Sequence, residues 1–262
     1  MAINLLITAL YNAVLAVLLY WIDKKTVFSK ASFKTKQIIF GVLFGAMAIF
    51  SSTNLGGIDI GNGTIMNVRD ASPLCAGLIF GAPAGIIAGF IGGIYRFVAT
   101  FYGLAGTYTQ IACSISTILA GLIAGLLRKY MFDDKKPTWI YGAGIGMICE
   151  VIHMLMIFFT NMNDAKAAFE FVKVCTVPMI LGNGLSVGLA IIIVSCISRD
   201  GVKKVDKQKQ ISQTFQRWLF ICIVIAFVAT SSFSSVLQTG MSEVQTNKYM
   251  NIHFLYMLRI FY

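Results

Sequence analysis

Long apolar runs alternate with short polar segments along most of the chain. Six of these runs are close to the roughly 20 residues that a helix needs to cross the hydrocarbon core of a bilayer. They cover residues of about 3–22, 38–56, 108–128, 138–160, 174–198 and 218–237. The pattern predicts an all-α fold, a polytopic membrane bundle of helices.

A seventh apolar region, residues 66–97, is rich in glycine and reads "MNVRDASPLCAGLIFGAPAGIIAGFIGGIYRF". We expect two short helices at about 67–80 and 83–100, because the "GAPAG" of residues 81–85 is typical of a turn. Spacing of small residues by four lets helices approach closely. The positions given this structural role are Gly77, Gly81, Pro83, Gly85, Gly89 and Gly93.

The basic residues support this hairpin. They gather in three loops, at 23–37, 128–136 and 199–217. If residues 74–95 formed one span, the first two loops would lie on opposite sides of the membrane, against the positive-inside rule. With a hairpin, all three loops are cytoplasmic and the N-terminus lies outside. The first apolar run has no basic segment before it, so it is not a cleavable signal peptide.

Composition limits the class of protein. The chain has 262 residues, of which 57% are hydrophobic and 12% charged, and a soluble domain of this size would expose too much apolar surface. The net charge of +10 is spread over loops, which argues against nucleic-acid binding. The six cysteines lie in or beside apolar runs without a CxxC pair, so we expect neither a disulfide framework nor a zinc site. We find no catalytic motif, and expect no cofactor and no enzymatic activity.

Two arginines, Arg69 and Arg96, stand at the ends of the hairpin. In one straight helix they would lie about 40 Å apart, whereas the hairpin places them side by side. One interpretation is that they reach lipid headgroups or pair with Asp70 and Asp59. The other is an anion site in which two guanidinium groups hold a carboxylate.

Neutral polar side chains follow on the next helix. Thr109, Cys113, Ser116 and Thr117 are spaced i, i+4, i+7 and i+8, which puts them on one helical face. They would bind a keto or hydroxyl oxygen beside the arginines, or else bond back to their own helix.

Two further polar groups lie in later spans. Glu150 and His153 are spaced i, i+3, as in half of a di-iron carboxylate site, but the spans offer no further ligands, so we expect no metal. A buried, protonated or hydrogen-bonded glutamate is the alternative. Pro178 is expected to kink its helix and Asn183 to bond across helices.

Several motifs follow one another between about residues 38 and 198. They are "NVRD" at 67–70, "GLIFGAPAGIIAGFIGGIYRF" at 77–97, "CSISTILAGLIAGLL" at 113–127, "EVIHMLMI" at 150–157 and "PMILGNGLSVG" at 178–188. Together, in this order, they resemble the LytS-YhcK type 5TM receptor family. The resemblance implies that the family's ligand-related arginines match Arg69 and Arg96, and its polar helix positions Cys113 and Ser116. The full candidate ligand set is Asn67, Arg69, Arg96, Thr109, Cys113, Ser116, Thr117 and Asn183.

The resemblance also implies a function. Members are inner-membrane input domains attached to histidine kinases, diguanylate cyclases or SpoIIE-type phosphatases. Some histidine-kinase members respond to pyruvate, and others are linked to cell-wall and autolysin control. We therefore expect the input domain of a two-component sensor histidine kinase in a phosphorelay, most often a homodimer, which binds a small carboxylate and acts with an output domain or response regulator.

The same glycine-rich pattern is similar to the six-helix substrate-binding subunits of energy-coupling-factor (ECF) transporters, the alternative function. A transporter subunit would be expected to stop near residue 198, whereas here a basic linker continues the chain. We expect a receptor domain at 1–198, a cytoplasmic linker at 199–217, an additional span at 218–237 and an extracytoplasmic tail at 238–262. No output module follows, so we expect a truncated or frameshifted receptor, or a protein that pairs with a separate kinase.

Overall fold

The computed structural model describes residues 2–25, 27–53, 56–59 and 65–198, and five positions at 219, 220, 223, 224 and 227. The predicted basic linker and tail, and most of the predicted last span, lie outside the described residues. The side chain of Asp59 lies outside them too, so its expected pairing with an arginine stays a prediction.

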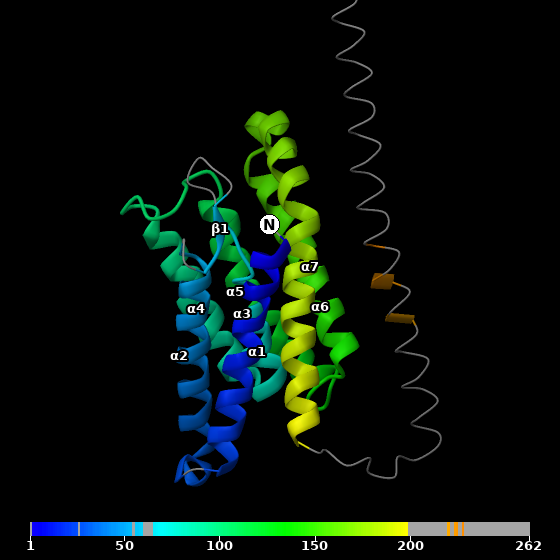
Figure 1. The fold of residues 1–262 in the computed structure, drawn as a ribbon. Helices are drawn as coiled ribbons and strands as arrows, with labels where there is room; N and C mark the ends of the chain where they lie inside the picture. The colour runs from blue at the N-terminus through cyan, green and yellow to red at the C-terminus, as the bar shows by residue number, and fades with distance from the viewer. Residues whose placement is uncertain are drawn as a thin grey trace, which may run out of the picture. The chain divides into compact units, whose positions relative to one another are not determined.

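The described residues are almost entirely helical (Figure 1). A two-stranded antiparallel ribbon pairs Ile58 with Met66 and Asp59 with Ile65. The elements are α1 (Ala2–Lys25), the 3₁₀ helix η1 (Val27–Lys30), α2 (Phe33–Ser51), β1 (Ile58–Asp59), β2 (Ile65–Met66), α3 (Ala71–Cys75), the π-helix η2 (Ala76–Phe80), α4 (Ala82–Ala99), α5 (Gln110–Tyr130), α6 (Trp139–Thr160), the 3₁₀ helix η3 (Met162–Asp164) and α7 (Ala165–Ser198).

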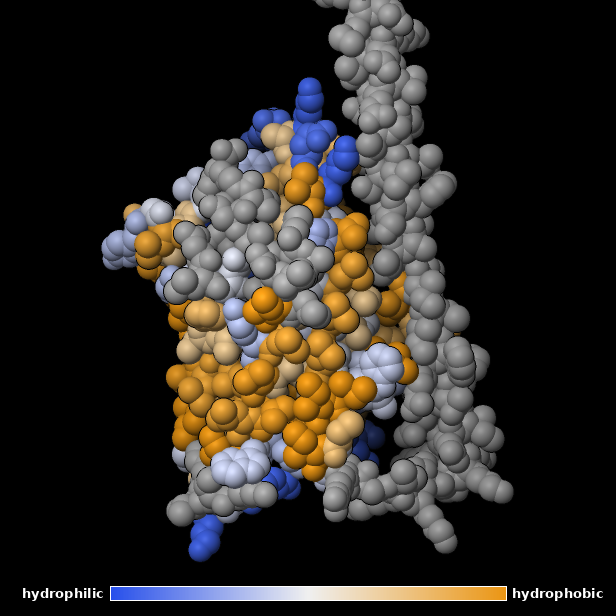
Figure 2. Space-filling model, viewed as in Figure 1, coloured by the Kyte–Doolittle hydropathy of each residue, from blue (hydrophilic) through white to orange (hydrophobic). Residues whose placement is uncertain are grey.

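Among the described residues, five helical segments are long and apolar enough to cross a membrane. They are α2, α4, α5, α6 and the segment Met162–Ser198 that contains α7. A broad band of hydrophobic side chains covers the visible face of these helices, and hydrophilic side chains gather towards both ends (Figure 2). The predicted helical membrane bundle is confirmed. The first apolar run forms α1, and its crossing of the membrane stays a prediction.

The predicted hairpin is present. Its first arm is the continuous pair α3 and η2, its second arm is α4, and Gly81 separates them. The arms are so close that a Cβ atom on Gly85 would lie 2.7 Å from the Cα atom of Gly77. A Cβ on Gly89 would lie 2.9 Å from the carbonyl oxygen of Thr117 on α5. These glycines therefore permit the close approach that the spacing predicts.

The turn of the hairpin depends on groups from other helices. Gly81 has φ of 147°, a value that residues with a Cβ rarely adopt. The side chain of Gln37 donates to the Phe80 carbonyl at 2.9 Å and accepts from the Ala84 amide at 3.1 Å. Arg128 donates to the carbonyl of Leu78 at 2.5 Å. Backbone groups freed by the irregular turn are thus satisfied within the bundle, as an apolar environment requires.

The short arm α3 lies at the centre of the bundle (Figure 1). Helix α4 packs on α2 and α5, α6 packs on α7, and α1 packs on α7. Helix α3 contacts both groups, since it touches α1, α2, α4, α5 and α7. Any displacement of α3 therefore reaches most of the bundle.

The first two basic loops, 23–37 and 128–136, lie at one end of the bundle. Lys36, in the first turn of α2, forms an ion pair with Asp23 of α1 at 2.7 Å. Lys136, after α5, donates to Ser198 at the end of α7 at 3.0 Å and lies over the ring of Tyr20. The hairpin predicted from the sequence requires these two loops to lie at the same end of the bundle. The side of the membrane on which they lie stays a prediction.

Helix α7 begins earlier than the apolar pattern predicts. It starts at Ala165 rather than near residue 174, and its 34 residues span about 51 Å, against a hydrocarbon core of about 30 Å. Lys166, Glu170 and Lys173 lower the hydropathy of its first turns without ending the helix. The Asp164 side chain accepts from the Ala167 amide at 3.1 Å and caps this start. Pro178 lies inside the continuous helix.

Candidate functional site

A small pocket opens between the hairpin, α5, α6 and α7, at the end of the bundle opposite the first two basic loops. Its volume is about 30 Å³, room for one or two water molecules. One side is polar and includes both arginines, and the other is apolar. The lining residues are Ser52, Asn67, Arg69, Arg96, Ala105, Gly106, Thr109, Cys113, His153, Ile157, Phe171, Cys175 and Met179.

Arg69 is almost fully buried and its guanidinium group is already engaged. Its Nε donates to the Thr117 hydroxyl at 2.7 Å and lies 3.4 Å from Asp70 Oδ1. Its Nη2 donates to the carbonyl of Cys113 at 3.3 Å, and its Nη1 to the Ser52 hydroxyl at 3.4 Å. The pairing with Asp70 that the sequence left open is therefore present, although Arg69 also lines the pocket.

Asp70 anchors this arginine to α5. Its carboxylate accepts from the Thr117 hydroxyl at 2.6 Å and from the hydroxyl of Ser116. Asp70 directly precedes α3, so these bonds attach the start of the short hairpin arm to α5. A buried carboxylate needs such partners, because an isolated charge in an apolar interior is very costly.

Arg96 differs from Arg69 in having free donor capacity. Its Nη2 donates to the Thr109 hydroxyl at 2.9 Å and to the Gly106 carbonyl at 3.0 Å. Its Nη1 is buried and has no hydrogen-bond partner among the described residues. Since the side chain lines the pocket, this unpartnered charged donor is the strongest indication that the pocket binds an anion.

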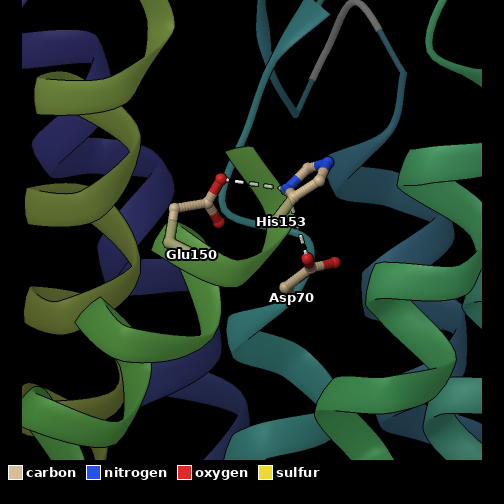
Figure 3. A group of neighbouring side chains, drawn as sticks. All are labelled: Asp70, Glu150 and His153. Atoms are coloured by element: carbon tan, nitrogen blue, oxygen red, sulfur yellow. Dashed lines mark hydrogen bonds and ion pairs between the residues drawn. The ribbon is translucent and has the colours of Figure 1, made fainter. Parts of the chain in front are cut away.

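A chain of hydrogen bonds runs from the pocket into α6. The sulfur of Cys113 lies 3.3 Å from Nε2 of His153, and Nδ1 of the same ring lies 2.9 Å from Glu150 Oε1. Figure 3 shows the imidazole between Glu150 and Asp70, whose Oδ2 is 3.4 Å from Nδ1. The expected buried, hydrogen-bonded Glu150 is confirmed.

The same chain continues to α7 through Asn183. Its amide nitrogen donates to Glu150 Oε2 at 2.7 Å, and its amide oxygen accepts from the backbone of Ala71 at 2.9 Å. The predicted bond of Asn183 across helices is confirmed. Asn183 is not among the pocket-lining residues, so a direct role in ligand binding stays a prediction.

Asp70, Glu150 and His153 also have the donor types of a metal site, and their ligand atoms lie within 4.8 Å of one another. The structure thus adds Asp70 to the Glu150–His153 pair, a third donor that the sequence did not identify. Each of the three is already hydrogen-bonded, and the guanidinium of Arg69 lies 3.4 Å from Asp70. A cation would compete with that positive charge, so we interpret the cluster as a hydrogen-bond network.

Five of the eight candidate ligand residues line the pocket: Asn67, Arg69, Arg96, Thr109 and Cys113. Ser116 and Thr117 lie behind it and hold Asp70, although they share the expected helical face. Thr117 also lies 2.9 Å from the Cys113 carbonyl, which is the alternative of bonding back to the helix.

Two polar residues that line the pocket, Ser52 and His153, were not in the candidate ligand set, although the sequence did single out His153 beside Glu150. His153 carried a usable signal, because an ionisable residue inside a span is a candidate for function. Ser52 carried none, since its position depends on where α2 ends relative to the hairpin.

The profile of the family described as 5TMR of 5TMR-LYT matches residues 22–197. Among similar proteins, the sensor histidine kinase YpdA of Escherichia coli (strain K12) is 30% identical over 168 residues, 64% of this chain and 27% of YpdA. The sensor protein LytS of Staphylococcus saprophyticus is 33% identical over 177 residues, 62% of this chain and 28% of that protein. The sensor histidine kinase BtsS of E. coli (strain K12) is 25% identical over 189 residues, 71% and 30% of the two chains.

The chain therefore spans less than a third of the length of these relatives. No solved structure matches it. The match covers the five-helix sensor region, and the apolar helices agree with a multi-pass plasma-membrane protein. Because the profile covers well over half of the sequence, the chain belongs to the 5TMR of 5TMR-LYT family, the membrane-embedded receptor domain of LytS-type sensors.

Proposed function

We propose that this chain is the signal-receptor domain of a bacterial two-component sensor histidine kinase and that it binds a small carboxylate. The kinase relatives support the first half of this proposal. The second half depends on Arg96, a buried arginine in the pocket with an unpartnered Nη1. Pyruvate, which the family resemblance implies, is the first ligand to test.

The two arginines have different roles in this proposal. Arg96 supplies the free donor that meets the carboxylate. Arg69 adds positive potential, while its own hydrogen bonds keep it in place. Asn67 and Thr109 line the same pocket, where the ligand's remaining oxygen would lie. This division extends the sequence-based hypothesis of two equivalent guanidinium groups.

The small size of the pocket couples binding to movement. A space with room for one or two water molecules is narrow for a carboxylic acid with a carbon chain, so in this proposal the lining groups move apart when the ligand enters. Phe171 and Met179 belong to the α7 side of the pocket, and Asn67 and Arg69 to the hairpin side. Ligand binding therefore favours a state in which α7 is displaced relative to the hairpin.

In the whole protein, the displaced α7 would act on an output kinase, which in turn would act on a response regulator. We propose a homodimer, and we propose the domain division made from the sequence, with the receptor at 1–198 followed by a linker at 199–217. The link to cell-wall control in the family stays a prediction for this chain.

The test is the thermal stability of the detergent-purified protein with pyruvate, other small carboxylates, an uncharged amide analogue and vitamins. We expect one or more carboxylates to raise the melting temperature and the amide to have no effect. Arg96→Ala and Arg96→Lys should lose the stabilisation, since lysine keeps the charge but not the fork of donors. Lys135→Ala, which removes an exposed charge at the opposite end, is the matched control.

Two results would contradict the proposal. Equal stabilisation of the unaltered protein and of Arg96→Ala by a carboxylate would show that Arg96 does not bind the ligand. Stabilisation by a vitamin and by no carboxylate would favour the transporter-subunit alternative.

A further inference from the structure

The pocket contains a cysteine in the setting of a nucleophile. Cys113 Sγ lies 3.3 Å from His153 Nε2, and His153 Nδ1 lies 2.9 Å from Glu150 Oε1. A thiol beside an imidazole whose other nitrogen is held by a carboxylate is the general arrangement of nucleophile, base and orienting group. Binding of a carboxylate does not require this arrangement.

The contacts of the ring assign its proton. Nδ1 faces two carboxylates, Glu150 at 2.9 Å and Asp70 at 3.4 Å, so it acts as a donor. Nε2 is then the nitrogen that takes the thiol proton and later returns it. The Asn183 amide bonds the second oxygen of Glu150 at 2.7 Å and fixes that carboxylate.

A second, independent observation points to the ligand of this thiol. Arg96 is 6% exposed, lines the same pocket and keeps an unpartnered Nη1. A carboxylate held there brings the carbon next to it into the pocket that Cys113 lines. If that carbon is a ketone carbonyl, it is electrophilic, and the guanidinium charges of the pocket stabilise the oxygen that becomes negative on attack.

We propose that Cys113 reversibly captures a small 2-oxo acid as a thiohemiketal, an inference that rests on the proposed carboxylate-binding function. The Cys113 sulfur forms a bond to the carbonyl carbon, and the π electrons of the carbonyl move to its oxygen. The proton taken from the thiol by His153 is delivered to that oxygen. No oxidant or reductant is consumed, and the reverse steps release the unchanged acid.

This chemistry makes the receptor selective. A 2-hydroxy acid or an unsubstituted acid has the same carboxylate for Arg96 but no electrophilic carbon for Cys113. The pocket should therefore bind pyruvate more tightly than lactate or propanoate, by a ratio that depends on the thiol.

Cys75 provides a matched control outside the pocket. It is a fully buried cysteine of α3 that does not line the pocket, and no hydrogen bond joins its sulfur to any described side chain. A Cys75→Ser variant removes a buried thiol without touching His153, whereas Cys113→Ser leaves a hydroxyl that is a weaker nucleophile.

The test combines two measurements on the purified full chain. The ¹³C spectrum of pyruvate labelled at C2 reports covalent capture, because the carbon changes from a carbonyl to a tetrahedral centre. Dissociation constants for pyruvate, lactate and propanoate report selectivity. We expect a tetrahedral signal and a preference for pyruvate of at least about tenfold, both lost in Cys113→Ser and both kept in Cys75→Ser.

Propanoate shows whether the variant is folded. Cys113→Ser protein that still binds propanoate has an intact anion site. If this variant loses only the tetrahedral signal and the preference for pyruvate, the result supports capture by Cys113. A bound pyruvate that keeps its carbonyl signal, with equal selectivity in Cys113→Ser, would overturn the inference and leave the carboxylate-receptor proposal standing. Loss of propanoate binding in Arg96→Ala tests that proposal separately.

Discussion

Asn183 of α7 donates a 2.7 Å hydrogen bond to the carboxylate of Glu150 on α6, and both side chains are buried. Glu150 also holds His153, which contacts Cys113 in the pocket. The oxygen of Asn183 accepts from the Ala71 amide at the start of α3. A continuous set of hydrogen bonds thus joins the pocket to α7 and to the central hairpin arm, and under the proposed function it offers a physical route from ligand to output.

Replacing Asn183 should weaken the packing of α7. Asn183→Ala leaves an oxygen of Glu150 and the Ala71 amide without their partner, so we expect a loss of about 1–3 kcal/mol in the free energy of unfolding. The measurement is thermal or denaturant unfolding in detergent. Asn161→Ala is the control, because the hydrogen bonds of the Asn161 side chain stay within the partly exposed end of α6. Equal destabilisation by the two substitutions would show that the hydrogen bonds of Asn183 to Glu150 and Ala71 do not stabilise the packing of α7.

Arg69 and Asp70 should depend on each other for stability. Arg69→Ala leaves the Asp70 charge buried without its cation, at a cost of about 3–5 kcal/mol. Adding Asp70→Asn removes the stranded charge and should recover part of this loss. The measurement is a double-mutant cycle on the free energy of unfolding. Additive effects of the two substitutions would show that the 3.4 Å contact carries no coupling.

The sequence predicted the hairpin because two independent signals agreed. The "GAPAG" segment favoured a turn, and the positions of the basic loops required an even number of crossings. The side chains that satisfy the turn could not be predicted. Gln37 comes from the first turns of α2 and Arg128 from the end of α5, and only the packed bundle brings them to Phe80 and Leu78.

The sequence predicted which residue types make up the candidate site, but it predicted less well which of these residues contact one another. Spacing on one helical face placed Thr109 and Cys113 together, as the structure does. Spacing within α5 could not show that Ser116 and Thr117 turn to Asp70, because that contact depends on where the loop before α3 enters the bundle. For the same reason, His153 could be identified as ionisable but not as the partner of Cys113.

Gly85 of the hairpin and Gly125 of α5 should differ sharply in their tolerance of a methyl group. In Gly85→Ala the new Cβ would lie 2.7 Å from the backbone of Gly77, and we expect a loss of about 1–3 kcal/mol from overpacking. In Gly125→Ala the nearest atom is a side-chain carbon of Ala82 at 3.3 Å. This control should be near neutral, because alanine also favours the helix. The measurement is the melting temperature, and equal shifts in the two variants would argue against the close hairpin packing.

The orientation of the bundle can be tested with cysteines placed at its two ends. Tyr102 lies in the loop after α4, on the arginine side, and Lys135 in the loop after α5, on the basic side, and both are exposed. If the basic loops are cytoplasmic, a membrane-impermeant maleimide added to intact cells should label Tyr102→Cys and not Lys135→Cys, while lysed cells should label both. The unaltered protein gives the background, since four of its described cysteines are buried and Cys196 lies in the apolar helix α7. Labelling of Lys135→Cys alone in intact cells would reverse the orientation and put the pocket on the cytoplasmic side, where it would sample the carboxylates inside the cell.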